Sequence, residues 1–313
     1  MSTKLSFTVV IPTKNRPDDL LLAVESILKS SLLPDEIIIV DQSISDDSKL
    51  PVVKFFELNG KTSILKYHHN SEINGLVAAK DFGVKLSKFE IILFLEDDIY
   101  LEPDYFCEII KVFNCDDKVK GCSGIIVNLP RRSKIHILIH RLFHCGIFQD
   151  SRYEIFSSSV KKHHLIQSNA ISGGISAWRR EVFDVVKFDI ISGFHVFEDL
   201  DFSKRVAAKF GDVLYINLKA RLQHFYSLVN RDSVARSQER FVIEMFKFYL
   251  KRRRDKFAEI SMLWLLTGTF FDSIYKSFCL LSLEPIKYFI KGVHSGFILL
   301  TGGLKDEVQR LNS

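Results

Sequence analysis

The feature that most restricts the fold is an apolar run, Ile91–Leu95, which ends in three consecutive carboxylates, Glu96-Asp97-Asp98. Five apolar residues bounded by polar ones predict a strand buried on both faces, as in a parallel sheet. Three adjacent carboxylates repel one another and are destabilised by desolvation. They are therefore expected either in a solvated turn or around a cation. Oxygen ligands of this kind suit Mg²⁺ or Mn²⁺.

Strand-like and helix-like segments alternate through the first part of the chain, which predicts βαβ units. Strands are expected over residues 5–11, 36–40, 62–67, 91–95 and 119–127, and helices from Pro17, over 75–86 and from Pro103. In open sheets of this kind, ligands bind beyond the carboxyl ends of the strands. Thr13, Asp41 and the acidic triplet all follow predicted strand ends, so we expect them to line one crevice.

Composition narrows the class of protein. The 313 residues are 47% hydrophobic and 26% charged, enough for one large α/β domain with an appendage. The net charge of +5 is only mildly basic and does not indicate a nucleic-acid partner. Five cysteines without a CxxC pair argue against a disulfide framework and a zinc site. Because a strand begins within a few residues of the start, no signal peptide is expected, and the protein is predicted in the cytoplasm.

The pattern changes between residues 130 and 165. His136, His140 and His144 recur every four residues among apolar neighbours, so they share one face of a predicted helix. Either this face binds a metal, or the helix is amphipathic and lies on a membrane surface. Nearby arginine and lysine residues repel a cation and favour the membrane surface.

The end of the chain is expected to be helical. Two short strand-like runs, residues 213–217 and 220–225, are followed by a basic cluster, Lys251–Arg254, and an apolar stretch, Phe257–Leu283. Charged residues interrupt this stretch, so it lacks the ~20 consecutive apolar residues that a membrane-spanning helix needs. Helices lying in the membrane interface, with the arginines facing anionic head groups, are therefore preferred. The remaining interpretation is that these helices simply pack on the rest of the protein.

Six local patterns, in order between residues 5 and 225, resemble the family 2 glycosyltransferases. They are Ile11-Pro12-Thr13-Lys14-Asn15-Arg16-Pro17, Val40-Asp41-Gln42-Ser43, Asn74-Gly75 with Ala79-Lys80-Asp81, Glu96-Asp97-Asp98, Ser172-Gly173-Gly174 with Trp178, and Phe197-Glu198-Asp199-Leu200-Asp201-Phe202. The resemblance implies the GT-A fold, a Rossmann-like, mostly parallel sheet flanked by helices, here with a C-terminal helical extension. We expect this domain over residues 1–228, with a basic amphipathic insertion at 130–165, and a membrane-associated helical tail over 229–313.

The resemblance also implies a role for each matching residue. Pro12, Thr13, Asn15, Asp41, Lys80, Glu96 and Asp97 would bind the nucleotide, and Gly173, Gly174, Trp178 and Glu198 would form the loop around donor sugar and acceptor. Asp98 and His224 would hold the metal, and Asp199 would be the catalytic base. Two of these residues have simpler interpretations. His224 is equally well explained as a locally bonded strand-end histidine, and Asp199 could be a helix N-terminal acid favoured by the helix dipole. Glu96 departs from the usual first aspartate of DxD, and Gln42, Lys80 and Asp81 also differ from common family residues.

The chemistry implied by the resemblance explains why these residue types are needed. An acceptor hydroxyl attacks the anomeric carbon of a nucleotide-diphosphate sugar, and the diphosphate leaves. A carboxylate must take the hydroxyl proton, because the hydroxyl pKa lies far above 7. A divalent cation stabilises the charge that grows on the diphosphate. When nucleophile and leaving group lie on opposite faces of the sugar, the product is inverted.

These features predict a metal-dependent inverting glycosyltransferase at the inner face of the cell membrane, with a lipid-linked or surface-polysaccharide acceptor and L-rhamnose as one candidate donor sugar. A sugar-phosphate nucleotidyltransferase and a nicotinamide dehydrogenase are disfavoured, because no glycine-rich loop follows the first predicted strand. A non-catalytic, membrane-bound scaffold of a polysaccharide assembly complex is the remaining alternative.

Overall fold

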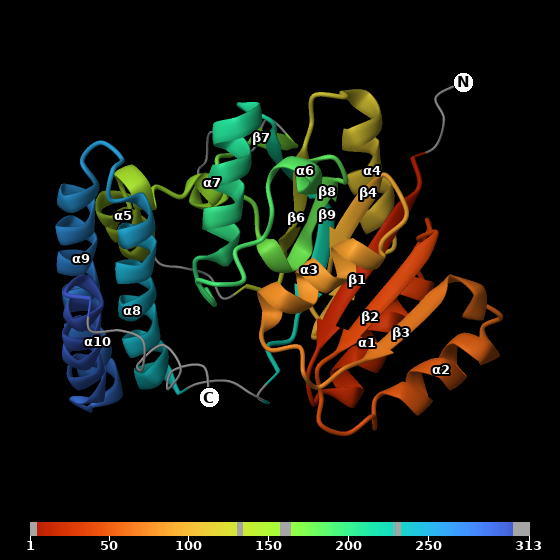
Figure 1. Ribbon diagram of the computed structural model, residues 1–313, viewed down its shortest axis with the longest axis horizontal. Helices are drawn as coiled ribbons and strands as arrows, with labels where there is room; N and C mark the ends of the chain where they lie inside the picture. Colours follow the sequence, from red (N-terminus) through yellow and green to blue (C-terminus); the bar gives the residue numbers. More distant parts are fainter. Residues whose placement is uncertain (1–4, 130–133, 157–163, 228, 230–232, 303–313) are drawn as a thin grey trace. The chain divides into compact units, whose positions relative to one another are not determined.

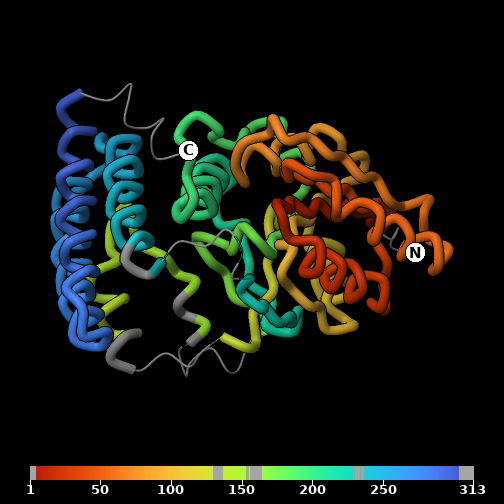
Figure 2. Tube along the Cα trace, turned by 90° about the horizontal axis from the view of Figure 1, so that it is seen from below, coloured from red at the N-terminus to blue at the C-terminus, as the bar shows by residue number. Residues whose placement is uncertain are grey.

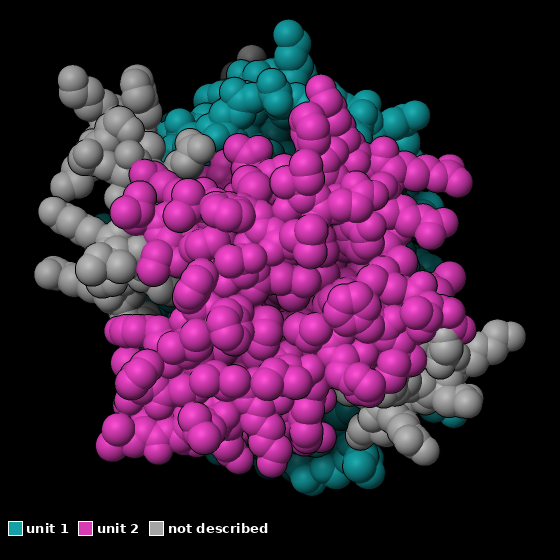
Figure 3. All heavy atoms as spheres, turned by 90° about the vertical axis from the view of Figure 1, so that its left-hand side faces the viewer, with its two compact units in different colours: residues 1–130, 154–190, 202–230 teal, residues 131–153, 191–201, 231–313 magenta. Residues whose placement is uncertain are grey.

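The computed structural model describes residues 5–129, 134–156, 164–227, 229 and 233–302. Packing divides the chain into two compact units (Figure 3). Unit 1 comprises residues 1–130, 154–190 and 202–230, and unit 2 comprises residues 131–153, 191–201 and 231–313. Each unit therefore gathers three stretches that are separated in the sequence.

Unit 1 is built on one sheet, to which the described residues contribute nine strands (Figure 1). The strands are β1 Phe7–Thr13, β2 Glu36–Asp41, β3 Leu65–His69, β4 Ile91–Phe94, β5 Ile99–Leu101, β6 Gly121–Ile126, β7 Leu165–Gln167, β8 Ser176–Arg179 and β9 Leu214–His224. Their order is β3-β2-β1-β4-β8-β6-β9-β5, with β7 paired to β9. Strands β3, β2, β1 and β4 run parallel to one another. Strand β8 is antiparallel to β4 and β6, and β6 runs parallel to β9.

Two apolar layers cover the faces of this sheet, because successive side chains of a strand point to opposite faces. Val9 and Ile11 of β1 lie in one layer, and Val10 of the same strand lies in the other. The first layer is completed by α1 (Pro17–Leu28), α2 (Lys49–Leu58) and α4 (Tyr105–Cys115). The second is completed by α3 (Leu76–Leu86), α6 (Val182–Val185) and the part of α7 (Glu198–Phe210) from Phe202 onward. Buried on both faces, β1, β2 and β4 need the continuous apolar runs seen in the sequence.

The parallel core agrees with the sequence prediction, with differences at its borders. The third strand starts at Leu65 rather than at residue 62, because residues 62–64 form a 3₁₀ turn. The two strand-like runs at 213–217 and 220–225 form one continuous strand, β9. Helix α2 and strands β5, β7 and β8 were not predicted, since they are short or lack a clear periodic pattern.

Unit 2 is helical in its described part. Its helices are α5 (Lys134–Phe143), α8 (Val234–Arg252), α9 (Ala258–Leu280) and α10 (Glu284–Leu300). The last three lie side by side (Figures 1 and 2). Gly292 and Gly296 allow the close approach of α10 to α8, because a Cβ atom at either position would collide with Val242 or Phe246. Within the described residues, every helix is too short or too polar to cross a membrane.

Candidate active site

Three potential metal ligands converge in unit 1, where β4 ends. Glu96 and Asp98 follow that strand directly, and the pairing of Ile99 with His224 brings the end of β9 beside them. The Nε2 atom of His224 lies 2.8 Å from Oδ1 of Asp98 and 2.9 Å from Oε2 of Glu96. One ligand atom from each of these residues lies within 4.8 Å of the other two. The pairing of strands β5 and β9 therefore brings His224 to the two carboxylates, although it lies far from them in the sequence.

The environment of His224 fits a cation. Its Nε2 atom is buried and, among the described residues, has no partner in hydrogen-bond geometry, although both carboxylates are close. Burial alone would lower the pKa of His224, but the carboxylates of Asp98 and Glu96 raise it to about 9. Two carboxylates and one imidazole around a buried, unsatisfied nitrogen form a donor set that a divalent cation would neutralise and satisfy.

Asp98 is held as an ionised, oriented carboxylate. Burial would raise its pKa, but His224, the backbone N–H of Ser227 and the charge of Arg16 hold that pKa well below its usual range. The Ser227 N–H donates to Oδ2 at 2.8 Å. Oδ1 therefore faces His224 while Oδ2 is anchored to the backbone, which is the arrangement of a pre-positioned ligand.

Asp97 is bound by two side chains from outside the ligand cluster. The hydroxyl of Thr13 donates to its Oδ2 at 2.7 Å, and Arg16 donates to its Oδ1 at 2.9 Å. Burial raises the pKa of Asp97 to about 6, against the opposing effects of Arg16 and Thr13. Thr13, at the end of β1, and Asp97 thus join two neighbouring strand ends and fix the turn that carries the ligands.

Glu96 is positioned by the glycine pair. Its backbone N–H donates to the carbonyl of Gly174 at 2.9 Å. A Cβ atom at residue 174 would lie 2.1 Å from Oε1 of Glu96, so a side chain there would displace the carboxylate. Gly173 begins the same 3₁₀ turn, Gly173–Ile175. The absence of a side chain at Gly174 is what allows Glu96 its present place.

Asp41, at the end of β2, forms a second polar cluster in unit 1. It is fully buried and accepts hydrogen bonds from the backbone N–H of Ser43 at 2.9 Å and from the hydroxyl of Tyr67 at 2.6 Å. Burial, together with this bond, raises the pKa of Tyr67 far above its usual value. Asn15 joins the cluster, because its N–H donates to the Ser43 hydroxyl at 2.7 Å. The expected nucleotide-binding residues of the first two strand ends are therefore linked.

Three further predicted residues lie in the core of unit 1. Pro12 belongs to β1. Lys80, on α3, is almost completely buried, with its amine 5.7 Å from the centre of the Phe94 ring. The indole of Trp178 is buried in β8, donates to the Ser176 hydroxyl at 2.9 Å and packs edge-on against Phe202. Their contacts in this structure are those of core side chains.

Glu198 and Asp199 belong to unit 2 and begin helix α7. Arg152 pairs with Oδ2 of Asp199, and the Leu200 N–H donates to Oδ1 at 2.7 Å. Arg152 is also bound to Asp150, whose Oδ2 lies 2.7 Å from its Nη2. Both oxygens of the proposed base therefore have fixed donors.

Several residues of these clusters were not singled out from the sequence. Arg16 stood within the first motif, and Ser227 lies three residues beyond His224, so proximity to a motif could have indicated both. Asn128 holds the backbone of His224 by two hydrogen bonds of 2.9 and 3.0 Å. Neither Asn128 nor Arg152 carries a sequence signal, because each reaches its partner only through the fold. The side chain of His136 lies outside the described part. The ring of His140, in α5, stacks on that of His144, just after the helix, with 3.7 Å between the ring centroids.

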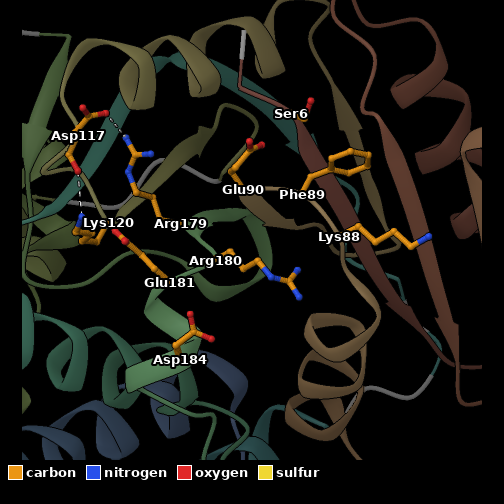
Figure 4. A pocket seen from close by; sticks show the side chains of 10 residues that line it. All are labelled: Ser6, Lys88, Phe89, Glu90, Asp117, Lys120, Arg179, Arg180, Glu181 and Asp184. Atoms are coloured by element: carbon orange, nitrogen blue, oxygen red, sulfur yellow. Dashed lines mark hydrogen bonds and ion pairs between the residues drawn. The ribbon is translucent and has the colours of Figure 1, made fainter. Parts of the chain in front are cut away.

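A separate cavity of about 760 Å³ lies in unit 1 at the other end of the strands (Figure 4). It is lined by residues that precede β1, β4 and β6, among them Ser6, Glu90 and Lys120. Four of its charged groups form ion pairs: Lys120 with Glu181 at 2.6 Å, and Arg179 with Asp117 at 3.3 Å. The cavity thus lies at the opposite end of the parallel strands β1 and β4 from their carboxyl ends.

Comparison with known proteins identifies similar sequences. The profile of Glycosyl transferase family 2 matches residues 8–186, more than half of the chain. The chain is 28% identical over 205 residues to a Bacillus subtilis protein described as the uncharacterized glycosyltransferase YwdF, covering 65% of this chain and 68% of that one. It is 27% identical over 179 residues to the hyaluronan synthase of Streptococcus pyogenes, covering 55% of this chain but only 40% of the synthase.

Solved structures show the same fold. The mannosyltransferase PcManGT from Pyrobaculum calidifontis, in complex with GDP-Man and Mn²⁺, superposes with a TM-score of 0.61 at 15% identity, covering 95% of this chain and 88% of that one. Residues 1–349 of TarS from S. aureus, in complex with UDP-GlcNAc, give a TM-score of 0.60 at 14% identity, covering 94% and 81%. The GT-A fold predicted from the sequence is confirmed.

Proposed function

Because the chain belongs to glycosyltransferase family 2, we propose that it is a metal-dependent inverting glycosyltransferase that uses a nucleotide-diphosphate sugar. The observation that carries the proposal is the cluster of Glu96, Asp98 and His224, which lies where the parallel strands end. PcManGT and TarS were crystallised with GDP-Man and UDP-GlcNAc, and these complexes support a nucleotide-sugar donor.

Asp98, Glu96 and His224 would hold Mg²⁺ or Mn²⁺. When bound, such a cation stabilises the charge that grows on the departing diphosphate. Asp97 would not be a ligand, since Thr13 and Arg16 already engage its two oxygens. Its part is to hold the turn between β4 and β5 in the shape that presents Asp98.

Asp199 would act as the general base. The acceptor hydroxyl is a poor nucleophile until a neighbouring carboxylate takes its proton during attack. Arg152 pairs with one oxygen of Asp199 and would fix the direction in which the carboxylate faces the acceptor hydroxyl. Transfer from the face of the sugar opposite the diphosphate would invert the anomeric carbon.

The proposed acceptor is a lipid-linked or surface polysaccharide at the cytoplasmic face of the membrane. Support comes from α9, whose exposed apolar residues recur at helical spacing on one side. Leu263 is 66% exposed and Phe278 is 76% exposed, although both are large and apolar. Exposed arginines, Arg253 and Arg254, stand just before this helix and would face anionic head groups.

The proposed chemistry is tested by calorimetry of the purified chain across a panel of nucleotide-diphosphate sugars, an L-rhamnose donor included, with and without Mn²⁺. We expect one donor to bind in the presence of Mn²⁺ and to lose that binding in the Asp98→Asn variant. A scaffold without catalytic function would bind none of the donors under either condition, and that result would refute the proposal.

The proposed location is tested by sedimentation with anionic vesicles. The double variant Leu263→Glu, Phe278→Glu should remain in the supernatant, because both substitutions place charge on the apolar side of α9. Leu58→Glu is the matched control, since Leu58 is 87% exposed but lies on α2 of unit 1. If the double variant sedimented with the vesicles as the wild type does, α9 would not be the membrane contact. The same conclusion would follow if a chain lacking residues 250–313 sedimented as the wild type does.

A further inference from the structure

The segment that carries Asp199 packs within the helical unit. Residues 191–201 cluster with α8 and with residues 131–153 as part of unit 2 (Figure 3). Helix α7 begins in this segment and continues from Phe202 into unit 1. The position of Asp199 therefore depends on contacts made by unit 2, and three kinds of contact are present.

Aromatic packing fixes the backbone two residues before Asp199. The ring of Phe197 lies 5.3 Å from that of Phe241 and 5.4 Å from that of Phe248, both on α8. It also lies 5.9 Å from the ring of Phe148, which precedes Arg152 in the chain. Phe197, Phe248 and Phe148 are nearly or completely buried, so this packing leaves the segment little freedom.

A buried carboxylate holds the same backbone. Glu244 on α8 is 2% exposed, and its oxygens accept the N–H groups of His195 at 2.9 Å, Val196 at 2.5 Å and Phe197 at 3.3 Å. These donors lie just before the first turn of α7, where helical hydrogen bonds do not yet satisfy N–H groups. A neutral side chain at residue 244 could not accept all three bonds in this geometry, and buried N–H groups without partners are costly. Glu244 thus determines how the chain enters α7.

An arginine holds the carboxylate itself. Arg152 pairs with Oδ2 of Asp199 through one guanidinium nitrogen and contacts Asp150 through Nε and Nη2, at 2.7 to 3.0 Å. Asp150 anchors the guanidinium, so Arg152 presents a fixed donor and not a mobile one. The carboxylate plane of Asp199 is thereby oriented from outside its own helix.

From these contacts we propose that Glu244 and Arg152 are positioning residues for Asp199, Glu244 for its backbone and Arg152 for its carboxylate. The inference rests on the proposed function, in which Asp199 takes the acceptor proton. A base displaced by about 1 Å loses much of its effect, since proton transfer requires hydrogen-bond distance to the hydroxyl. Through Glu244 alone, helix α8 would then help to position the base, whatever contact the C-terminal helices make with a membrane.

The test compares steady-state kinetics of the full chain, with the donor and acceptor that the wild type uses. Glu244→Gln and Arg152→Lys should each lower kcat by about 10- to 100-fold, while the KM for the donor and Mn²⁺-dependent donor binding change less than about twofold. Glu239→Gln is the matched control, because Glu239 lies on the same helix and, among the described residues, forms no hydrogen bond or ion pair with the 191–201 segment. Its kcat should equal that of the wild type.

The outcomes separate the two hypotheses. If the wild type transfers no sugar from any donor, the proposed function fails. If Asp199→Asn is inactive while Glu244→Gln and Arg152→Lys keep the wild-type kcat, the function stands and the positioning role is wrong. If Glu244→Gln melts below the assay temperature, the kcat of Arg152→Lys alone tests the positioning role. Arg152 is partly exposed, and its replacement leaves the packing of Phe197 intact. A change in donor KM with an unchanged kcat would also overturn the proposal.

Discussion

The two units each hold an aspartate that the sequence assigns to catalysis, and they hold it differently. In unit 1, Asp98 faces a histidine and a second carboxylate, and the Nε2 atom of His224 has no hydrogen-bond partner among the described residues. In unit 2, Asp199 faces the guanidinium of Arg152, which Asp150 holds in place. Both side chains receive one backbone N–H bond as well.

The difference follows from the charge of the neighbours. Two carboxylates beside one imidazole leave negative charge and an unsatisfied nitrogen, an arrangement that a divalent cation completes. Asp199, in contrast, already has a cationic partner in Arg152. The two aspartates thus have different neighbours, and for this reason we propose metal ligation for Asp98 and proton transfer for Asp199.

The largest effect is expected at Asp199. Replacing it with asparagine removes the proton acceptor, so kcat should fall by on the order of 10²- to 10⁴-fold, while Mn²⁺-dependent donor binding is retained. Kinetics and calorimetry on the same preparation measure both quantities. Asp255→Asn is the control, since Asp255 pairs with Arg252 at 2.8 Å on the surface of unit 2. If Asp199→Asn kept the wild-type kcat, Asp199 would not be the general base, and the proposed contrast between Asp98 and Asp199 would be wrong.

The next effect is expected at His224. His224→Gln deletes the imidazole ligand, and we expect Mn²⁺ affinity to fall by about 10- to 100-fold, with a parallel loss of donor binding. Calorimetric titrations with Mn²⁺ and with the donor measure the two affinities. His164→Gln replaces an exposed histidine of the same unit and should bind Mn²⁺ as the wild type does. Equal affinity in both variants would mean that His224 is only a strand-end residue.

A smaller effect on the metal site is expected at Gly174. The new Cβ in Gly174→Ala would collide with Glu96, whose flexible side chain must move, so Mn²⁺ affinity should fall by about tenfold with the fold intact. Gly60→Ala provides the contrast, because Gly60 has a φ of +64° and no neighbour within 4 Å of an added Cβ. That substitution should lower stability by about 1–2 kcal/mol and leave metal affinity unchanged. Thermal melts and titrations distinguish the two; unchanged affinity in Gly174→Ala would show that Glu96 is not a ligand.

The smallest effect is expected at the cavity on the other end of the strands. Glu181→Gln breaks the pair with Lys120, but the glutamate side chain is 56% exposed, so stability should change by no more than about 0.5–1 kcal/mol. Donor binding and kcat should match the wild type. If kcat fell by more than about twofold, the cavity would take part in the reaction, contrary to this expectation.

Much of unit 1 could be predicted from the sequence. The run before Glu96 is apolar because β4 is buried on both faces, and such runs identify parallel strands locally. The family resemblance was likewise carried by short motifs of residues that are close in the chain, and the family match confirms it. The additional strands at β5, β7 and β8 escaped prediction, since three or four residues are too few to show a period.

The site was only partly predictable. The candidate ligands Asp98 and His224 were named from motifs, but their approach to each other depends on the pairing of Ile99 with His224 across the sheet. The direction of Asp97, turned toward Thr13 and Arg16, could not be inferred from its place in the triplet. The assigned roles of the individual residues stay predictions until the variants above are measured.

The sequence by itself determined the family, the parallel core and the identity of the acidic residues at its edge, because each depends on residues that are neighbours in the chain. Only the tertiary structure decided which carboxylate faces a histidine and which faces an arginine. Arg152, Asp199 and Glu244 come from three separate stretches, and packing alone brings them into one unit. The fold thereby places two aspartates of the same chain in different electrostatic surroundings, one beside a histidine and one beside an arginine.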